Sequence, residues 1–236
     1  MIVDPEFLLT PGLVLAMWAA GMAAGIAVIA GWDIVGPAFF WVAGGSTLLV
    51  GASAMVDGGP GGVVGVVALL VAMVVARRPG PLSIAMGLAS LGFFVEAAQR
   101  GGWFLAVTGG LAVGLVTDEM LLGHWYLVNP KLPRWSLKAL AIAGGGALAL
   151  DAMLLLLAGG LVGIGVVGWA FLALIGMSLL LMVGVWFALR EPSYPGVMAA
   201  TGLSYLAVLT SLGATVAGRS LVGQAVNLLA AIRLAP

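Results

Sequence analysis

The sequence contains no cysteine, and this absence excludes several kinds of chemistry at once. Disulfides, thiolate nucleophiles, iron–sulfur clusters and thiolate zinc sites all require that residue. The chain also has a single histidine, His124, so it cannot by itself hold a haem between two histidines. Its formal net charge is zero and no basic patch stands out, so nothing supports nucleic-acid binding.

Signatures of common enzyme classes are missing as well. The sequence has no Gly-x-Ser-x-Gly elbow, no histidines and acids at zinc-ligand spacing, and no glycine-rich phosphate loop followed by lysine. A retinal Schiff base needs a lysine inside a span, whereas Lys131 and Lys138 flank the start of one. No catalytic residue and no metal ligand set is therefore predicted.

Polar surface is scarce too. The 236 residues are 63% hydrophobic and 8% charged, with a mean hydropathy of +1.22, which is too apolar for a water-soluble globule. We therefore expect an all-α, polytopic integral membrane helix bundle surrounded by lipid. A span needs about 20 apolar residues, and glycine, proline and charge divide residues 1–218, one transmembrane domain, into eight predicted spans: 12–31, 36–56, 60–77, 81–99, 102–128, 135–159, 162–189 and 194–217. The third is short, and without it the count is seven.

Glycine, in contrast, is abundant, with 37 residues. Small residues let helix backbones approach closely in a bilayer, where no hydrophobic force drives helices together. GxxxG spacings recur at Gly21/Gly25, Gly61/Gly65, Gly110/Gly114 and Gly159/Gly163. They predict tight packing between helices without assigning particular interfaces.

Basic residues in the loops predict the orientation. With eight spans, one face carries Arg77, Arg78, Lys131, Arg134, Lys138 and Arg190, and the other carries Arg100, Arg219 and Arg233. The first face is therefore expected in the cytoplasm of a prokaryotic cell, with both termini outside it. Aromatic residues near span ends, such as Trp32, Trp135 and Tyr194, are typical of a membrane-interface belt.

Two local similarities suggest an internal duplication. The segment 77–79 before the fourth span resembles 190–192 before the eighth, and Gly44-Gly45 matches Gly144-Gly145. A parallel repeat of four plus four helices, as found in transporters, is consistent with both. After residue 218 the tail 219–236 has apolar residues at helical spacing, which predicts an amphipathic helix that either lies in the membrane interface or docks a partner subunit.

Ionisable residues inside spans are functional candidates because they are costly at membrane depth. Asp118 and Glu119 fall near the middle of the fifth span, Asp151 lies towards the non-cytoplasmic face and Glu96 near that face. Together they form a candidate proton or ion path. The alternative is separate structural roles, in which Glu96 pairs with Arg100 four residues later and Asp151 is hydrogen-bonded to a neighbouring span.

His124 marks a second candidate site near the cytoplasmic end of the fifth span. With Trp125 and Tyr126 it could face a quinone head group. It could also supply one axial ligand of a haem, alone or with a methionine or a partner chain as the second ligand. Met120 is a candidate at this corner, but it lies on the same face of the helix as His124, so these two residues cannot hold both sides of one haem. The same residues also fit an aromatic belt. A single metal ion bound by Asp118, Glu119 and His124 is excluded on one straight helix, because Asp118 and Glu119 point about 120° and about 140° away from His124.

Two functions follow from these features. The first is a non-catalytic subunit of a larger membrane assembly, such as an electron-transfer or respiratory complex, with quinone or haem at His124 and other membrane subunits and lipid as partners. The second is a small transporter coupled to protons or a cation through its midplane acids. The helix bundle itself favours neither.

Overall fold

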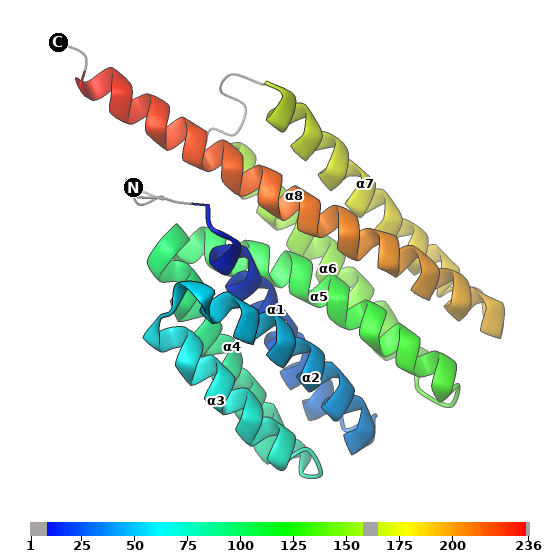
Figure 1. The fold of residues 1–236 in the computed structure, drawn as a ribbon. Helices are drawn as coiled ribbons and strands as arrows, with labels where there is room; N and C mark the ends of the chain where they lie inside the picture. Colours follow the sequence, from blue (N-terminus) through cyan, green and yellow to red (C-terminus); the bar gives the residue numbers. More distant parts are fainter. Residues whose placement is uncertain (1–8, 158–164, 235–236) are drawn as a thin grey trace.

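A computed structural model describes residues 9–157 and 165–234, except for the side chains of Asp57 and of residues 224–234. The described part consists of helices joined by short loops and contains no strand, which confirms the predicted all-α membrane bundle (Figure 1). Its helices are α1 (Pro11–Trp32), α2 (Pro37–Ala54), the short 3-10 helix η1 (Met55–Asp57), α3 (Pro60–Val74), α4 (Pro79–Gly101), α5 (Trp103–Val128), α6 (Arg134–Leu155), α7 (Val166–Ala188) and α8 (Tyr194–Leu234). Seven of them are long and apolar enough to cross a membrane, and α3 is shorter.

Four of the helices begin where the sequence supplies a proline. Pro11, Pro37, Pro60 and Pro79 each occupy the first turn of a helix, where the missing N–H costs nothing. The hydroxyl of Thr10 also accepts a hydrogen bond of 3.2 Å from the backbone N–H of Leu13, which caps α1. These signals place the helix starts within a few residues of the predicted spans.

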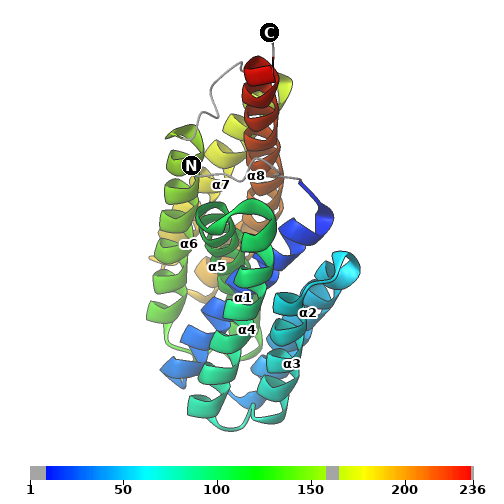
Figure 2. The same cartoon turned by 90° about the vertical axis from the view of Figure 1, so that its left-hand side faces the viewer.

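The eight helices form two similar halves (Figures 1 and 2). In the first half α1 packs against α2 and α4, and α3 packs against α2 and α4. In the second half α5 packs against α6 and α8, and α7 packs against α6 and α8. The same neighbours therefore recur at the same places in both halves, as a four-plus-four repeat predicts. The two halves meet mainly where α1 and α4 contact α5.

Glycines form the closest contacts between helices. A methyl group on Gly21 of α1 would overlap the carbonyl oxygen of Gly110 in α5, and one on Gly114 would overlap the backbone of Gly21. In the first half, a methyl group on Gly61 would lie 2.7 Å from the carbonyl oxygen of Gly92 in α4. Three of the predicted GxxxG pairs thus contribute to real interfaces, and the fourth, at residues 159 and 163, lies outside the described residues.

Helix α3 runs antiparallel to α2 along its length. Its first turn lies at the end of α2, where a methyl group on Gly62 would overlap the sulfur of Met55. Its last turn lies near the start of α2, where Trp41 Nε1 donates a 3.2 Å hydrogen bond to the carbonyl of Met73. The chain therefore returns along α3 to the end at which α2 began.

Helix α8 is longer than its predicted span. It continues without a break from Tyr194 to Leu234, so the predicted eighth span and the tail form one helix. Figure 1 shows its last turns extending beyond the other helices. The amphipathic pattern predicted for the tail falls mostly on side chains outside the described residues.

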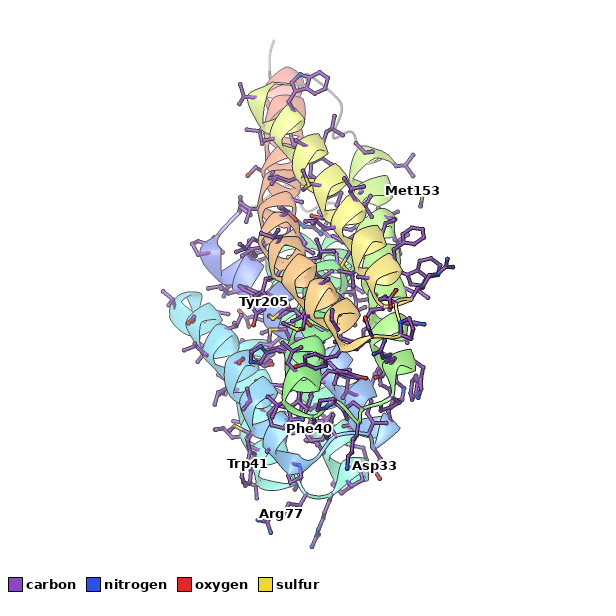
Figure 3. All side chains as sticks on the ribbon, turned by 90° about the vertical axis from the view of Figure 1, so that its right-hand side faces the viewer. Asp33, Phe40, Trp41, Arg77, Met153 and Tyr205 are labelled. Atoms are coloured by element: carbon purple, nitrogen blue, oxygen red, sulfur yellow. The ribbon has the colours of Figure 1, made fainter. Side chains whose placement is uncertain are left out.

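Large apolar side chains cover the outside of the bundle. Leu49, Val74 and Leu209 are among those more than half exposed, and this surface is suited to lipid. Figure 3 shows Trp41 and Met153 projecting from the surface and Arg77 at the end where α2 begins. Apolar side chains thus cover the sides of the bundle, and exposed charged residues such as Arg77 lie at its ends.

Candidate functional site: the buried acids of α5

Asp118 is completely buried where α5 faces α1. Its exposed fraction is 0%, and neither carboxyl oxygen has a hydrogen-bond partner among the described residues. The carboxyl group fits only because residue 25 of α1 is glycine: a methyl group on Gly25 would overlap Oδ2 of Asp118. Counted along α5, Asp118 lies about 22 Å from the first residue and about 15 Å from the last, at about 1.5 Å per residue.

Glu119 is also buried, but it points to a different helix. The hydroxyl of Ser204 in α8 donates a short hydrogen bond to Oε2 of Glu119, while Oε1 has no described partner. Adjacent residues on a helix point about 100° apart. Helix α5 therefore presents Asp118 to α1 of the first half and Glu119 to α8 of the second.

Thr117, the polar residue next to the two acids in the sequence, forms its hydrogen bonds with other groups. The hydroxyl of Thr117 accepts a 2.9 Å hydrogen bond from Trp18 Nε1 of α1 and donates one of 2.7 Å to the carbonyl of Val113. Its hydrogen-bonding capacity is thus used on other groups. No lysine or arginine among the described residues pairs with either acid. An ionised carboxylate here would be buried without compensation, so the neutral acid is the less costly form.

Glu96 has a structural environment at the end of the bundle where α4 ends and α3 begins. Its Oε1 accepts a 2.6 Å salt-bridging hydrogen bond from Arg100, which confirms the predicted pair. Its Oε2 accepts a 3.0 Å hydrogen bond from the backbone N–H of Gly62, in the first turn of α3. A side chain of α4 therefore caps α3, and the positive end of that helix favours the carboxylate.

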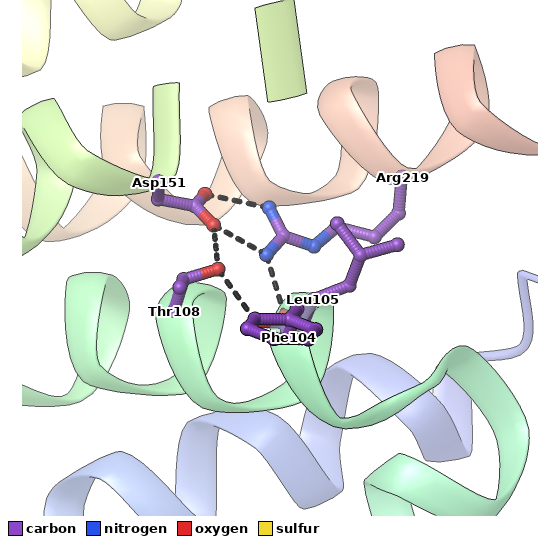
Figure 4. A network of polar contacts seen from close by, with 5 residues as sticks. All are labelled: Phe104, Leu105, Thr108, Asp151 and Arg219. Carbon is purple, nitrogen blue, oxygen red and sulfur yellow. Dashed lines mark hydrogen bonds and ion pairs between the residues drawn. The ribbon is translucent and has the colours of Figure 1, made fainter. Parts of the chain in front are cut away.

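Asp151 forms a buried ion pair with Arg219, shown in Figure 4. Two guanidinium nitrogens of Arg219 donate to the two carboxyl oxygens of Asp151, at 2.6 and 2.7 Å. The hydroxyl of Thr108 donates to the same carboxylate at 2.5 Å, and Arg219 also donates to the carbonyl of Leu105 at 2.7 Å. This cluster joins α5, α6 and α8, and it confirms that Asp151 bonds to a neighbouring span.

The position of Arg219 corrects one expectation from the sequence. We counted Arg219 among the residues beyond the last span, but its side chain is 0% exposed inside the bundle. The reason is that α8 continues past Gly218, so Arg219 lies on a helical face turned towards α5 and α6. The glycine at position 109 leaves space for the guanidinium group. Counting loop charges cannot reveal such a partner, because only helix packing identifies it.

The four candidate acids do not form a connected ladder among the described residues. Asp118 faces Gly25, Glu119 bonds to Ser204, and Glu96 and Asp151 pair with separate arginines. No hydrogen bond between any two of the four is present. Asp118 and Glu119 alone remain incompletely satisfied.

The residues of the candidate quinone or haem corner point towards different neighbours. His124 is exposed, and its Nδ1 lies 3.1 Å from the hydroxyl of Tyr205 in α8. Trp125 packs against Phe39 of α2, with ring centroids 5.9 Å apart. The hydroxyl of Tyr126 accepts a 3.3 Å hydrogen bond from Arg134. Met120 is partly buried against the core, so only His124 and Tyr205 form a pair on the outer surface.

Within the described residues, no three side chains from histidine, cysteine, aspartate and glutamate are placed to hold a metal ion. The chain matches no protein-family model, no curated protein and no solved structure.

Proposed function

We propose that this protein is a proton-coupled membrane transporter in which Asp118 and Glu119 bind and release the proton. One observation carries the proposal: of the four oxygens of these two buried carboxyl groups, three have no hydrogen-bond partner among the described residues. Buried polar groups with a purely structural role are normally satisfied. A group that must exchange a proton needs a different environment, in which neither state is locked by a permanent partner.

The position of the acids between the halves supports coupling to movement. Asp118 lies against α1 of the first half, and Gly21, Gly25 and Gly114 are the residues that let the two helices approach closely around it. A surface of glycines lacks the large side chains that would interlock the helices. A small shift of α1 against α5 would therefore change the surroundings of Asp118 without dismantling the bundle.

The second acid gives this movement a link to the other half. Glu119 is held by Ser204 of α8 through one oxygen only. Protonation of Glu119 would leave that oxygen a weaker acceptor, since a neutral carboxyl group attracts a hydroxyl less than a carboxylate does. Proton binding would thus loosen α8 from α5, as alternating access between repeats requires.

A pH-jump experiment tests the proposal without knowledge of the solute. Purified protein is reconstituted on a solid-supported membrane, and the transient current after a rapid pH change is recorded. We expect a current from the natural protein and its loss in Asp118→Asn and Glu119→Gln, because each variant keeps the shape of the side chain but cannot exchange a proton. Glu191→Gln, which changes an exposed acid in the α7–α8 loop, serves as the matched control and should keep the current.

Two results would contradict this function. One is an unchanged current in the combined Asp118→Asn and Glu119→Gln variant. The other is failure of Asp118→Asn to accumulate as a monodisperse protein, because this would mean that an ionised Asp118 with a cationic partner holds the fold together.

A second candidate function is a subunit of a larger membrane assembly that binds a quinone. The hydrogen-bonded pair of His124 and Tyr205 favours it, because both side chains lie on the surface, where a quinone would arrive through the lipid. A haem there would need its second axial ligand from a methionine or a partner chain. Extraction in a mild detergent discriminates the two functions: stoichiometric partner chains with bound quinone or a Soret band support the assembly, and a colourless, quinone-free single chain contradicts it.

We also propose an orientation in the cytoplasmic membrane. The loops after α3, α5 and α7, together with the first turns of α6, carry six of the nine basic residues, and positively charged segments of this kind are retained in the cytoplasm. The opposite end of the bundle has Arg100 and Arg219 in pairs with acids. The start of α1 and the end of α8 would then both lie outside the cytoplasm.

A further inference from the structure

An apolar groove of about 400 Å³ runs between α6 and α7 on the outer surface of the bundle. Its floor is open because residues 145 and 146 of α6 are glycines: a methyl group on Gly146 would meet nothing within 4 Å. The walls are aliphatic and aromatic, formed by Ala141, Ile142, Leu179, Met182, Val183, Trp186 and Phe187. This groove is separate from the buried acids of α5.

Two basic residues lie at the end of the groove where α6 begins and α7 ends, which is the cytoplasmic end in the proposed orientation. The guanidinium carbon of Arg190 is 3.6 Å from the ring centroid of Trp186, which lines the groove. Lys138 lies one turn before Ile142 on the same face of α6. Neither cation forms an ion pair with an acid among the described residues.

Neighbouring residues hold the α7–α8 loop in place at this end of the groove, but they do not neutralise the charges of Lys138 and Arg190. Arg134, one turn before Lys138, donates hydrogen bonds of 2.5 and 3.0 Å to the carbonyls of Glu191 and Ser193. It thereby ties the α7–α8 loop to α6. The Cβ of Glu191 lies against Gly196 of α8, and Glu191 does not line the groove. Basic groups therefore outnumber acids at this end.

We propose that the groove binds one anionic phospholipid of the cytoplasmic leaflet. An acyl chain would fill the apolar groove over Gly145 and Gly146, and the phosphate would lie between Lys138 and Arg190. Apolar walls facing lipid suit a hydrocarbon chain, and basic residues at the membrane surface attract anionic head groups. An apolar helix from another protein would fit the groove less well, because it would bury the two cations without compensation.

Native mass spectrometry of the full-length protein in mild detergent tests this site. The probes are dioleoylphosphatidylglycerol, which is anionic, and dioleoylphosphatidylcholine, which has the same chains and no net charge. We expect one phosphatidylglycerol to be retained in preference to phosphatidylcholine. Replacing both cations in Lys138→Gln with Arg190→Gln should weaken this binding about 30-fold, at about fivefold per surface charge.

Matched variants separate the groove from general effects. Gly146→Leu fills the open floor and should abolish retention, whereas Gly87→Leu adds the same side chain at an open position on α4 and should not. Arg77→Gln with Lys131→Gln removes two exposed charges from the same end of the bundle and should leave binding unchanged.

Three results would overturn the proposal. Equal retention of the two lipids would remove the role of the cations, and unchanged binding in Gly146→Leu would place the lipid elsewhere. A dimer that Gly146→Leu dissociates would assign the groove to a second copy of the chain. None of these outcomes depends on proton transport, so this site and the proposed function can fail separately.

Discussion

The ion pair between Asp151 and Arg219 is a residue-scale feature that ties three helices together. Removing one partner of a buried pair leaves a charge without compensation and costs about 3–5 kcal/mol, whereas replacing both by apolar residues is often neutral. Arg219 has no other acid among its described partners, and Thr108 offers Asp151 only a neutral hydroxyl. The pair therefore behaves as one unit.

We predict that Arg219→Met and Asp151→Asn each lower the temperature at which the detergent-solubilised protein aggregates. The combined Asp151→Leu and Arg219→Met variant should regain most of the loss. Size-exclusion chromatography after heating measures this, with Arg77→Met as an exposed control. If the combined variant lowered the aggregation temperature by the sum of the two single decreases, the pair would not act as a unit.

The sequence identifies the candidate acids, but it does not identify the residues that they contact. Asp118 and Glu119 were identifiable because carboxyl groups in the middle of an apolar span are rare and costly. Their neighbours were not, because Gly25 is 93 positions from Asp118 and Ser204 is 85 from Glu119. Arg219 was missed for the same reason: its partner Asp151 is 68 residues away, on another helix.

At the scale of helices, the α1–α5 contact depends on the absence of side chains. A methyl group on Gly21 would overlap a backbone carbonyl oxygen of α5, which cannot move aside as a side chain can. We predict that Gly21→Leu and Gly114→Leu prevent accumulation of folded protein, as measured by fluorescence-detected size-exclusion chromatography of a tagged chain. The larger residue would force the helices apart along the contact between the halves.

The control for this prediction is a leucine at a glycine that faces open space. Gly87→Leu in α4 and Gly176→Leu in α7 add the same bulk where nothing lies within 4 Å, and both should accumulate normally. If Gly21→Leu accumulated as well as these controls, the tight approach of α1 and α5 would not be required for folding.

Most helix boundaries followed from the sequence because proline, glycine and charge mark them. The starts of α2, α3 and α8 fall within one residue of the predictions. The end of α8 did not follow, because Gly218 and Arg219 resemble the end of a span, whereas the ion pair with Asp151 makes them part of the helix interior. A truncation designed to remove only the tail should therefore begin after Gly223 and not at Arg219.

At the scale of the whole molecule, the distribution of basic residues sets the expected topology. We predict that cysteines placed at Arg77, Lys131 and Glu191 are labelled from the cytoplasmic side, and those at Val56 and Trp103 from the opposite side. The natural side chains at all five positions are exposed, and the natural chain has no cysteine that would react with the label. Membrane-impermeant maleimide on intact cells and on inverted vesicles measures the labelling.

The short helix α3 makes this test informative. With 15 residues it extends about 22 Å, less than a typical hydrocarbon core of about 30 Å. Its pairing with α2 nevertheless returns the chain to the first side. Labelling of the Val56 and Arg77 positions from the same side would show that α3 does not cross the membrane, and the proposed orientation would be wrong for one of the halves.

The buried ion pair also implies an order of events during synthesis. A chain emerges from its N-terminus, so α6 enters the membrane with Asp151 before α8 exists. Until the last helix is made, Thr108 of α5 is the only neighbour in the finished cluster that can hold that acid. When α8 enters, Arg219 bonds to Asp151 of α6 and to Leu105 of α5 and so joins the three helices. A chain that stops before residue 219 would leave Asp151 in the membrane without its cation, at a cost of about 3–5 kcal/mol.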